Sequence, residues 1–358
     1  ATWTLVGIIS VLIVSISPLP KLFNHSIQPY TTQYNPTQSY TTLHNPMRGL
    51  VIKSTGTSYG VHFEDGTTAD CHVKGNFRIR GIRSTNPIAI GDYVEVTALD
   101  DGTHWITDLY DRKNYIVRRS TNLSYASHIL AANVDMAALI VTLRHPETST
   151  TFIDRFLATC EAYRVPACLI FNKVDLLNED EQHELSALRQ LYESLGYPTY
   201  AISALSLASS PDSTIASIFD GKVTLLSGNS GVGKSTLLNA ILGKDIARTG
   251  AISSAHHKGM HTTTFSEMYP LHNPTQPSWI IDTPGIKGFG MLDMERYEMG
   301  HYFREIFAIS QECRYSDCVH INEPGCAVNQ AVIDGRIALS RYESYLSMLD
   351  DITENKYR

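Results

Sequence analysis

The chain has 358 residues, 43% of them hydrophobic and 18% charged, and a formal net charge of −7. This composition is typical of a globular protein with two or three domains. It excludes nucleic-acid binding through overall charge, so that any such contact depends on local basic patches. Six cysteines are too few for a disulfide scaffold at this length. We expect the three scattered ones, Cys71, Cys160 and Cys168, to be small buried apolar residues.

Residues 1–46 differ from the rest of the chain. The apolar run from Leu5 to Ile16 has 12 residues, fewer than the ~20 that a membrane-spanning helix needs, and it lacks the basic leader of a signal peptide. Residues 24–46 are rich in Thr, Gln, Asn, Tyr and Pro, which predicts disorder. Because a folded pattern begins abruptly at Met47, we predict that Met47 is the physiological start and that residues 1–46 are an upstream extension. A genuine export or anchor segment is the alternative.

Residues 47–116 show a short, β-like pattern. Five apolar or alternating segments, such as Tyr93 to Val96, are separated by turn signals such as Asp65-Gly66 and Asp101-Gly102. Five short strands in about 70 residues favour a small closed β-barrel. We predict an OB-fold for this domain, with a generic SH3-like barrel as the alternative.

Residues 117–292 show longer apolar runs with helical stretches between them. Met136 to Thr142, Ala167 to Phe171 and Val223 to Leu226 are nearly continuous apolar runs, which is typical of strands covered on both faces. We therefore predict a mainly parallel α/β domain. Because the pattern then becomes helical, we predict a helical domain over residues 293–358.

Asn172-Lys173-Val174-Asp175 has the form of the guanine-reading motif of GTPases and directly follows a predicted strand. The Asp175 carboxylate can accept hydrogen bonds from both the N1–H and the N2 amine of guanine. Adenine offers no such pair of donors and would leave this carboxylate buried and unpaired. Ser203-Ala204 ends the next predicted strand, and we expect its backbone to contact the guanine O6.

Gly228-Asn229-Ser230-Gly231-Val232-Gly233-Lys234-Ser235 lies between a predicted strand and a predicted helix, which is the context that a phosphate loop requires. The glycines let backbone N–H groups turn toward the phosphates, and the helix N-terminus adds partial positive charge. We expect Lys234 to reach the β- and γ-phosphates and Ser235 to bind Mg²⁺. A glycine-rich turn without a ligand is the alternative.

Two switch motifs follow the phosphate loop. In Asp282-Thr283-Pro284-Gly285, we expect Asp282 to hold Mg²⁺ through a water and the Gly285 N–H to sense the γ-phosphate. His261-Thr262-Thr263-Thr264 lies where the first switch belongs, and we favour Thr263 over Thr262 as a Mg²⁺ ligand. The predicted nucleotide contacts are Asn172, Lys173, Asp175, Ser203, Ala204, Gly228, Asn229, Ser230, Gly231, Val232, Gly233, Lys234, Ser235, Thr236, Asp282 and Gly285.

Ile286 stands where many GTPases carry a glutamine that orients the attacking water. Isoleucine cannot do this, so that either the intrinsic rate is low or another group supplies the function. We name His261 as the candidate for that catalytic role, beside Thr263 and Lys234. A solvated loop histidine without a chemical role is the alternative for His261.

Cys313-x₄-Cys318-x-His320-x₅-Cys326 places three thiols and one imidazole within 14 residues. Cys₃His is the ligand set of a closed structural Zn²⁺ site, so we predict one structural zinc per chain and no catalysis at the metal. The ion would help to fold a small domain with little core. Reduced thiolates also indicate a reducing compartment.

The order of these motifs is the most specific feature of the sequence. The guanine motif precedes the phosphate loop, whereas an ordinary GTPase has the reverse order, so the G domain is circularly permuted. Together with the barrel, the metal motif and the Gly259-Met260-His261-Thr262-Thr263 stretch, this order resembles the ribosome-small-subunit-dependent GTPase A family (RsgA/YjeQ) from about Met47 onward. Met260 departs from that family, which often has arginine there, at a peripheral switch contact.

The resemblance implies a GTPase that hydrolyses GTP to GDP and phosphate and acts late in assembly of the small ribosomal subunit. It implies that the barrel and the zinc domain contact rRNA. We expect a cytoplasmic monomer that uses Mg²⁺ with GTP and has no DNA or membrane partner. The alternatives are a nucleotide-sensing RNA-binding checkpoint protein with negligible turnover and a membrane-tethered GTPase that uses residues 1–20.

Two basic groups favour RNA contact independently of the resemblance, because clustered cations bind phosphates and the face of an OB-fold commonly binds oligonucleotides. The first group is Lys74, Arg78, Arg80 and Arg83. The second group is Arg112, Lys113, Arg118 and Arg119. A merely solvated basic face is the alternative.

Overall fold

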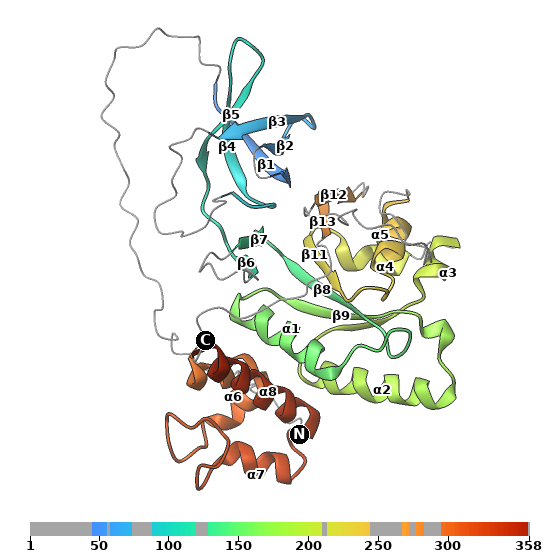
Figure 1. Cartoon of the computed structure of the whole chain (residues 1–358). Coiled ribbons are helices and arrows are strands. Elements are labelled where there is room, and N and C mark those ends of the chain that lie inside the picture. Colours follow the sequence, from blue (N-terminus) through green and yellow to red (C-terminus); the bar gives the residue numbers. More distant parts are fainter. Residues whose placement is uncertain are drawn as a thin grey trace, which may run out of the picture. The chain divides into compact units, whose positions relative to one another are not determined.

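The computed structural model describes most of the chain from residue 45 onward (Figure 1). The described residues are 45–55, 58–73, 88–118, 128–209, 213–243, 267–271, 276–282 and 295–356. The predicted N-terminal extension lies outside them except for its last two residues. None of the helices within these ranges combines the length and the apolar character that crossing a bilayer requires.

The first domain is a five-stranded β-barrel. Its strands are β1 (Met47–Ser54), β2 (Tyr59–Phe63), β3 (Thr68–Val73), β4 (Tyr93–Ala98) and β5 (His104–Leu109). They are hydrogen-bonded in the order β1-β2-β3-β5-β4, and a further pairing of β4 with β1 closes the barrel. The buried core includes Val51, Val61, Val94, Val96 and Ile106. Closure places alternate side chains of each strand inside the barrel, where they form this core. The predicted N-terminal barrel is confirmed by the closing pair of strands.

A two-stranded ribbon connects the barrel to the next domain. In it, β6 (Tyr115–Arg118) pairs with β7 (His128–Ala132). Gly91 of the barrel has a φ of +87° and lies so close to the ribbon that a Cβ atom there would be 2.1 Å from Ala132 O. The Asn133 side chain donates to Gly91 O at 2.8 Å. The junction thus depends on a close backbone approach that only glycine permits.

Two residues of the predicted second basic group also hold this junction. The Arg112 guanidinium is buried and donates two hydrogen bonds of 2.6 Å to the buried Asp92 carboxylate. Lys113 forms an ion pair with Asp135, whose other carboxylate oxygen accepts from Val223 N at 2.8 Å. Because a buried carboxylate needs a charged or hydrogen-bonded partner, the guanidinium of Arg112 is committed to the fold. The prediction of RNA contact is wrong for Arg112.

The other basic residues of the two predicted groups are not described at the level of their side chains. Arg118 is described only through its place in β6. The residues outside the described ranges are Lys74, Arg78, Arg80, Arg83 and Arg119. Their contact with RNA stays a prediction.

The second domain is built on a mainly parallel sheet, as predicted. The strands, in spatial order, are β10 (Thr199–Ala201), β9 (Ala167–Phe171), β8 (Met136–Val141), β11 (Val223–Gly228), β13 (Ser278–Asp282) and β12 (Glu267–Leu271). All pairs are parallel except β13 with β12. The antiparallel strand β12 also pairs with β1 of the barrel, where Lys53 lies opposite Glu267.

Helices cover both faces of this sheet (Figure 1). Leu139 and Leu169 pack in the core that contains α1 (Thr150–Ala162) and α2 (Glu179–Ser194). Their neighbours Ile140 and Ile170 pack in the opposite core. The helices of that second core are α3 (Ala204–Ser209), α4 (Ser213–Phe219) and α5 (Lys234–Leu242). Burial on both faces is the physical reason for the uninterrupted apolar runs in the sequence.

The C-terminal tail is helical and packs on α1. Its helices are η2 (Arg296–Tyr302), α6 (Arg304–Ser310), α7 (Ala327–Ile333) and α8 (Leu339–Lys356). Ala158 of α1 belongs to the same core as the apolar side chains of the tail. At this contact the buried Arg341 of α8 donates to Asp154 of α1 at 2.7 Å and to Glu305 of α6 at 2.6 Å. We call these three side chains the docking triad.

Candidate functional site

Asn172 connects three loops at the carboxyl edge of the sheet. It follows β9 and is 4% exposed. Its side-chain N–H donates to Val232 O of the phosphate loop at 2.8 Å, and its side-chain oxygen accepts from Ala204 N at 2.9 Å. An amide has one acceptor end and one donor end, and both ends are satisfied here. The structure thus brings together the predicted guanine motif, the phosphate loop and Ser203-Ala204.

Lys173 reaches from the guanine motif to the phosphate loop. Its ammonium donates to Gly231 O at 2.7 Å and also to His145 O. These two carbonyls fix the direction of its aliphatic stem. Asp175 lies in the 3₁₀ turn η1 (Val174–Leu176) and is exposed. Its carboxylate can accept hydrogen bonds from a bound base.

The phosphate loop takes its shape from its glycines. β11 ends at Gly228 and α5 begins at Lys234, which matches the predicted strand–loop–helix. Gly231 and Gly233 have φ values of +86° and +93°, in the region that favours glycine. A Cβ atom on Gly233 would lie 2.3 Å from the Nδ2 atom of Asn172. Glycine at this position therefore allows the phosphate loop to approach the guanine motif.

Lys234 and Asp282 form an ion pair at the ends of two neighbouring strands. Asp282 ends β13, which pairs with β11, and Lys234 begins the helix that follows β11. Their side chains are 13% and 24% exposed. A Mg²⁺–triphosphate carries a cation and anionic oxygens side by side, so this pair offers the opposite charge to each. Ser235 and Thr236 lie in the first turn of α5 beside Lys234.

Several predicted functional residues lie outside the described ranges. They are His261, Thr263 and Gly285, and Ile286, to which no function was assigned, also lies outside these ranges. The catalytic role of His261 and Thr263, the Mg²⁺ ligation by Thr263 and the γ-phosphate contact of Gly285 stay predictions. Ser235 and Asp282 are the described residues whose oxygens could hold Mg²⁺.

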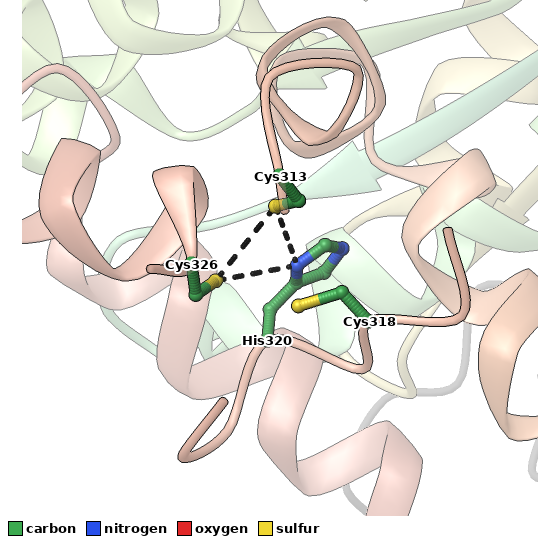
Figure 2. Close-up of side chains that lie close together, drawn as sticks. All are labelled: Cys313, Cys318, His320 and Cys326. Carbon is green, nitrogen blue, oxygen red and sulfur yellow. Dashed lines mark hydrogen bonds between the residues drawn. The ribbon is translucent and has the colours of Figure 1, made fainter. Parts of the chain in front are cut away.

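Four metal-ligand side chains converge in the tail (Figure 2). The ligand atoms of Cys313, Cys318, His320 and Cys326 all lie within 4.8 Å of one another. The Sγ atoms of Cys313 and Cys326 are 3.9 Å apart, and His320 Nδ1 lies 3.6 and 3.5 Å from them. Tetrahedral zinc, with bonds of ~2.0–2.3 Å, separates its ligands by about 3.5–3.8 Å. The donor set and its spacing fit a structural metal site.

Burial favours the neutral forms of Cys318, His320 and Cys326 through their pKa values. It raises the pKa of the Cys318 thiol to about 12 and also raises the pKa of Cys326. It lowers the pKa of His320, which keeps the imidazole neutral as metal ligation requires. A divalent cation would displace the thiol protons. The backbone N–H of Asn329 donates to Cys326 Sγ at 3.4 Å and would stabilise the thiolate.

Glu323 organises the loop that carries Cys318 and His320. Its carboxylate accepts hydrogen bonds of 2.9, 2.8 and 3.1 Å from the backbone N–H groups of Val319, Ile321 and Asn322. Partial burial raises the pKa of Glu323, but the backbone donors outweigh this effect and the pKa is lowered. A charged carboxylate thus fixes the backbone between two metal ligands. Outer-sphere groups of this kind orient the ligands.

The sequence reasoning missed two features beside these sites, the docking triad and the loop between β8 and α1. One signal for the triad was present, because Asp154 lies at helical spacing from the buried Leu157 and Ala158. A carboxylate on the apolar face of a helix indicates a buried cationic partner. The loop has no such signal, since its contacts to Lys173 involve a backbone carbonyl.

Known proteins share this architecture. The family profile described as RsgA GTPase matches residues 109–292, and the one described as RsgA N-terminal domain matches residues 48–106. A protein from Phocaeicola vulgatus named "Small ribosomal subunit biogenesis GTPase RsgA" is 59% identical over 312 residues, which are 87% of this chain and 99% of the relative. A protein of the same name from Porphyromonas gingivalis is 53% identical over 314 residues, again 87% of this chain and 99% of the relative.

Two solved structures are similar over nearly their whole length. YjeQ from Thermotoga maritima is 32% identical with a TM-score of 0.68, and the match covers 86% of this chain and 99% of that one. YloQ, described as a circularly permuted GTPase, is 27% identical with a TM-score of 0.65, and the match covers 90% of this chain and 100% of that one.

Proposed function

The chain belongs to the RsgA GTPase family, and from this premise we propose that it hydrolyses GTP to GDP and phosphate as an assembly factor of the small ribosomal subunit. Its relatives carry that role in their names. In this chain the barrel and the metal-bearing tail would contact rRNA late in assembly. We propose that the protein acts as a monomer in the cytoplasm, the compartment in which small subunits are assembled and thiols stay reduced.

The hydrogen bonding of Asn172 is the observation that carries this proposal. One side chain joins the loop that reads the base to the loop that cradles the phosphates. In the proposed site Asp175 accepts from the guanine N1–H and N2 amine. The phosphate-loop N–H groups and Lys234 bind the phosphates, and Ser235 and Asp282 hold Mg²⁺. Each role follows from the donors and acceptors that these residues offer.

The proposed domain boundaries are 47–116 for the barrel, 117–292 for the permuted G domain and 293–358 for the tail. The closed strand order supports a separate barrel from Met47 of β1 to Leu109 of β5. The tail would hold one Zn²⁺ through the four side chains already described, and the ligand spacing supports zinc. Zinc bound there would supply folding free energy to the tail.

Phosphate release tests this function. We expect the full chain to hydrolyse GTP in preference to ATP and isolated small ribosomal subunits to increase the rate. Lys234→Ala should abolish hydrolysis, because it removes the phosphate-loop ammonium. Lys222→Ala is the matched control and should keep parental hydrolysis, since Lys222 directly precedes β11 and its ammonium donates to Ile218 O at 2.7 Å. Equal use of ATP would refute the guanine site, and a rate unaffected by small subunits would refute the ribosomal role.

A nucleotide-sensing checkpoint protein with negligible turnover is the second candidate. The isoleucine at position 286 favours it, because this side chain cannot orient a water. Single-turnover hydrolysis separates the two functions. Nucleotide-dependent binding to small subunits without phosphate release, even when subunits saturate the protein, would favour the checkpoint.

A further inference from the structure

We propose that Thr142 is a positioning residue of the nucleotide site, because it closes the loop that holds Lys173 against the phosphate loop. The loop connects β8 to α1 and contains no nucleotide-binding motif. The proposal rests on the proposed function, since it takes the guanine motif and the phosphate loop to enclose one guanine nucleotide.

Thr142 and Thr148 join the two ends of this loop through hydrogen bonds, which we call the threonine clasp. Thr142 is 2% exposed, and its hydroxyl donates to Pro146 O. Its backbone N–H donates to the Thr148 hydroxyl at 3.2 Å, and the Thr148 N–H donates back to Thr142 O at 2.9 Å. Three hydrogen bonds therefore close residues 143–147 into a compact loop.

The closed loop contacts both halves of the nucleotide site. His145 O accepts from the Lys173 ammonium, which also donates to Gly231 O at 2.7 Å. A Cβ atom on Gly231 would lie 3.4 Å from Pro146 Cδ, so the proline packs beside the phosphate loop. The loop thus contacts the guanine motif through the His145 carbonyl and the phosphate loop through the Pro146 ring.

His145 has a φ of +56°, which is unfavourable for a residue with a side chain. Such a conformation persists where the surroundings over-determine it, and here the threonine clasp does so. If the clasp opens, the His145 carbonyl can turn away from Lys173. Nucleotide binding would then have to order this loop, and the entropy lost on ordering would weaken the affinity for nucleotide. Base choice would not change, since it depends on Asp175.

Thr142→Val tests the proposal, because it removes the hydroxyl donor and keeps the shape of the side chain. We expect the dissociation constants of GDP and GTP, measured with fluorescent nucleotides on the full chain, to rise about three- to tenfold, the effect of one net hydrogen bond. The preference for guanine over adenine and the turnover at saturating GTP should stay at parental values. Thr142→Ser keeps the donor and should bind nucleotide like the parent.

Thr159→Val is the matched control. Thr159 is a fully buried threonine of α1 whose hydroxyl donates to Arg155 O at 2.7 Å, away from the loop. Its valine variant should keep parental affinity. Thr148→Val opens the same clasp from the other side, and it replaces Thr142→Val if the latter does not fold.

Parental nucleotide affinity in both clasp variants would overturn the proposal. An equal loss of affinity in Thr159→Val, or a failure of Thr142→Ser to restore binding, would also overturn it, because the effect would then be one of general stability. These outcomes compare variants with the parent protein. A parent protein that binds adenine and guanine nucleotides alike would overturn the proposed function itself, so the two failures are distinguishable.

Discussion

Replacing Arg341 by methionine is expected to loosen the tail from α1 and to leave the nucleotide site intact. Methionine keeps much of the side-chain length and can still pack on Phe303, over whose ring the guanidinium lies at 4.6 Å. It removes the positive charge between Asp154 and Glu305. Two carboxylates would then share a buried position without a cation.

The size of the effect follows from burial. The side chains of Arg341 and Asp154 are 1% and 0% exposed. Removing one partner from such a pair costs about 3–5 kcal/mol, because an uncompensated charge stays buried. The Tyr192 hydroxyl, which donates to Asp154 at 2.9 Å, would still solvate that carboxylate. We therefore expect the lower end of the range, about 3 kcal/mol.

Hydrogen–deuterium exchange in α8 measures this loss directly. Because each ~1.4 kcal/mol changes an opening equilibrium tenfold, exchange in α8 should become about a hundredfold faster, with parental protection in the central sheet. Arg336→Met is the control, since Arg336 is half exposed and lies 3.7 Å from Asp334. It should change the opening free energy by less than ~1 kcal/mol. Parental protection of α8 in Arg341→Met would refute the view that the docking triad holds the tail.

Three further substitutions test the sites. Asp175→Asn replaces a carboxylate oxygen, which accepts hydrogen bonds, by an amide group that donates them. The affinity for GTP should therefore fall about a hundredfold, and xanthosine triphosphate should bind better than it does to the parent. If the variant still prefers GTP to xanthosine triphosphate in competition binding as the parent does, Asp175 does not read the base. Gly233→Ala should abolish nucleotide binding by calorimetry, because its Cβ would meet Asn172 at 2.3 Å. With the proposed zinc bound, Glu323→Gln should release the ion to a chelator about ten- to a hundredfold faster at neutral pH. The lowered pKa of Glu323 means that this stabilisation is present above the ordinary carboxyl pKa of 4.5 and is lost as the pH falls through the lowered value, so both proteins should release zinc alike in acid.

The elements of the fold could be predicted because their signals are local. A strand buried on both faces is a continuous apolar run, and a phosphate loop between a strand and a helix is a contiguous motif. The junction between the barrel and the sheet could not be predicted in this way. Whether Arg112 binds RNA or a carboxylate depends on the burial of Asp92, 20 residues away in the sequence, and burial is a property of the closed barrel.

The same distinction applies to the candidate sites. Residue type alone predicted the four candidate metal ligands and the guanine motif, since both chemistries demand particular side chains, and the structure brings the four candidate ligands together. The contacts of Asn172 with Val232 and Ala204 required the fold, because both partners are backbone atoms. The contact of the β8–α1 loop with Lys173 could not be predicted from the sequence for the same reason, because any residue type can supply a backbone carbonyl.

The position of β11 between β8 and β13 has a mechanical consequence. In the sequence the barrel precedes β8 and the tail follows β13, so the two appended domains are tethered to the strands on either side of the phosphate-loop strand. Tension carried along the chain between the barrel and the tail would therefore cross the ladder hydrogen bonds of β11, in parallel with the β1–β12 pairing and the contact of the tail with α1.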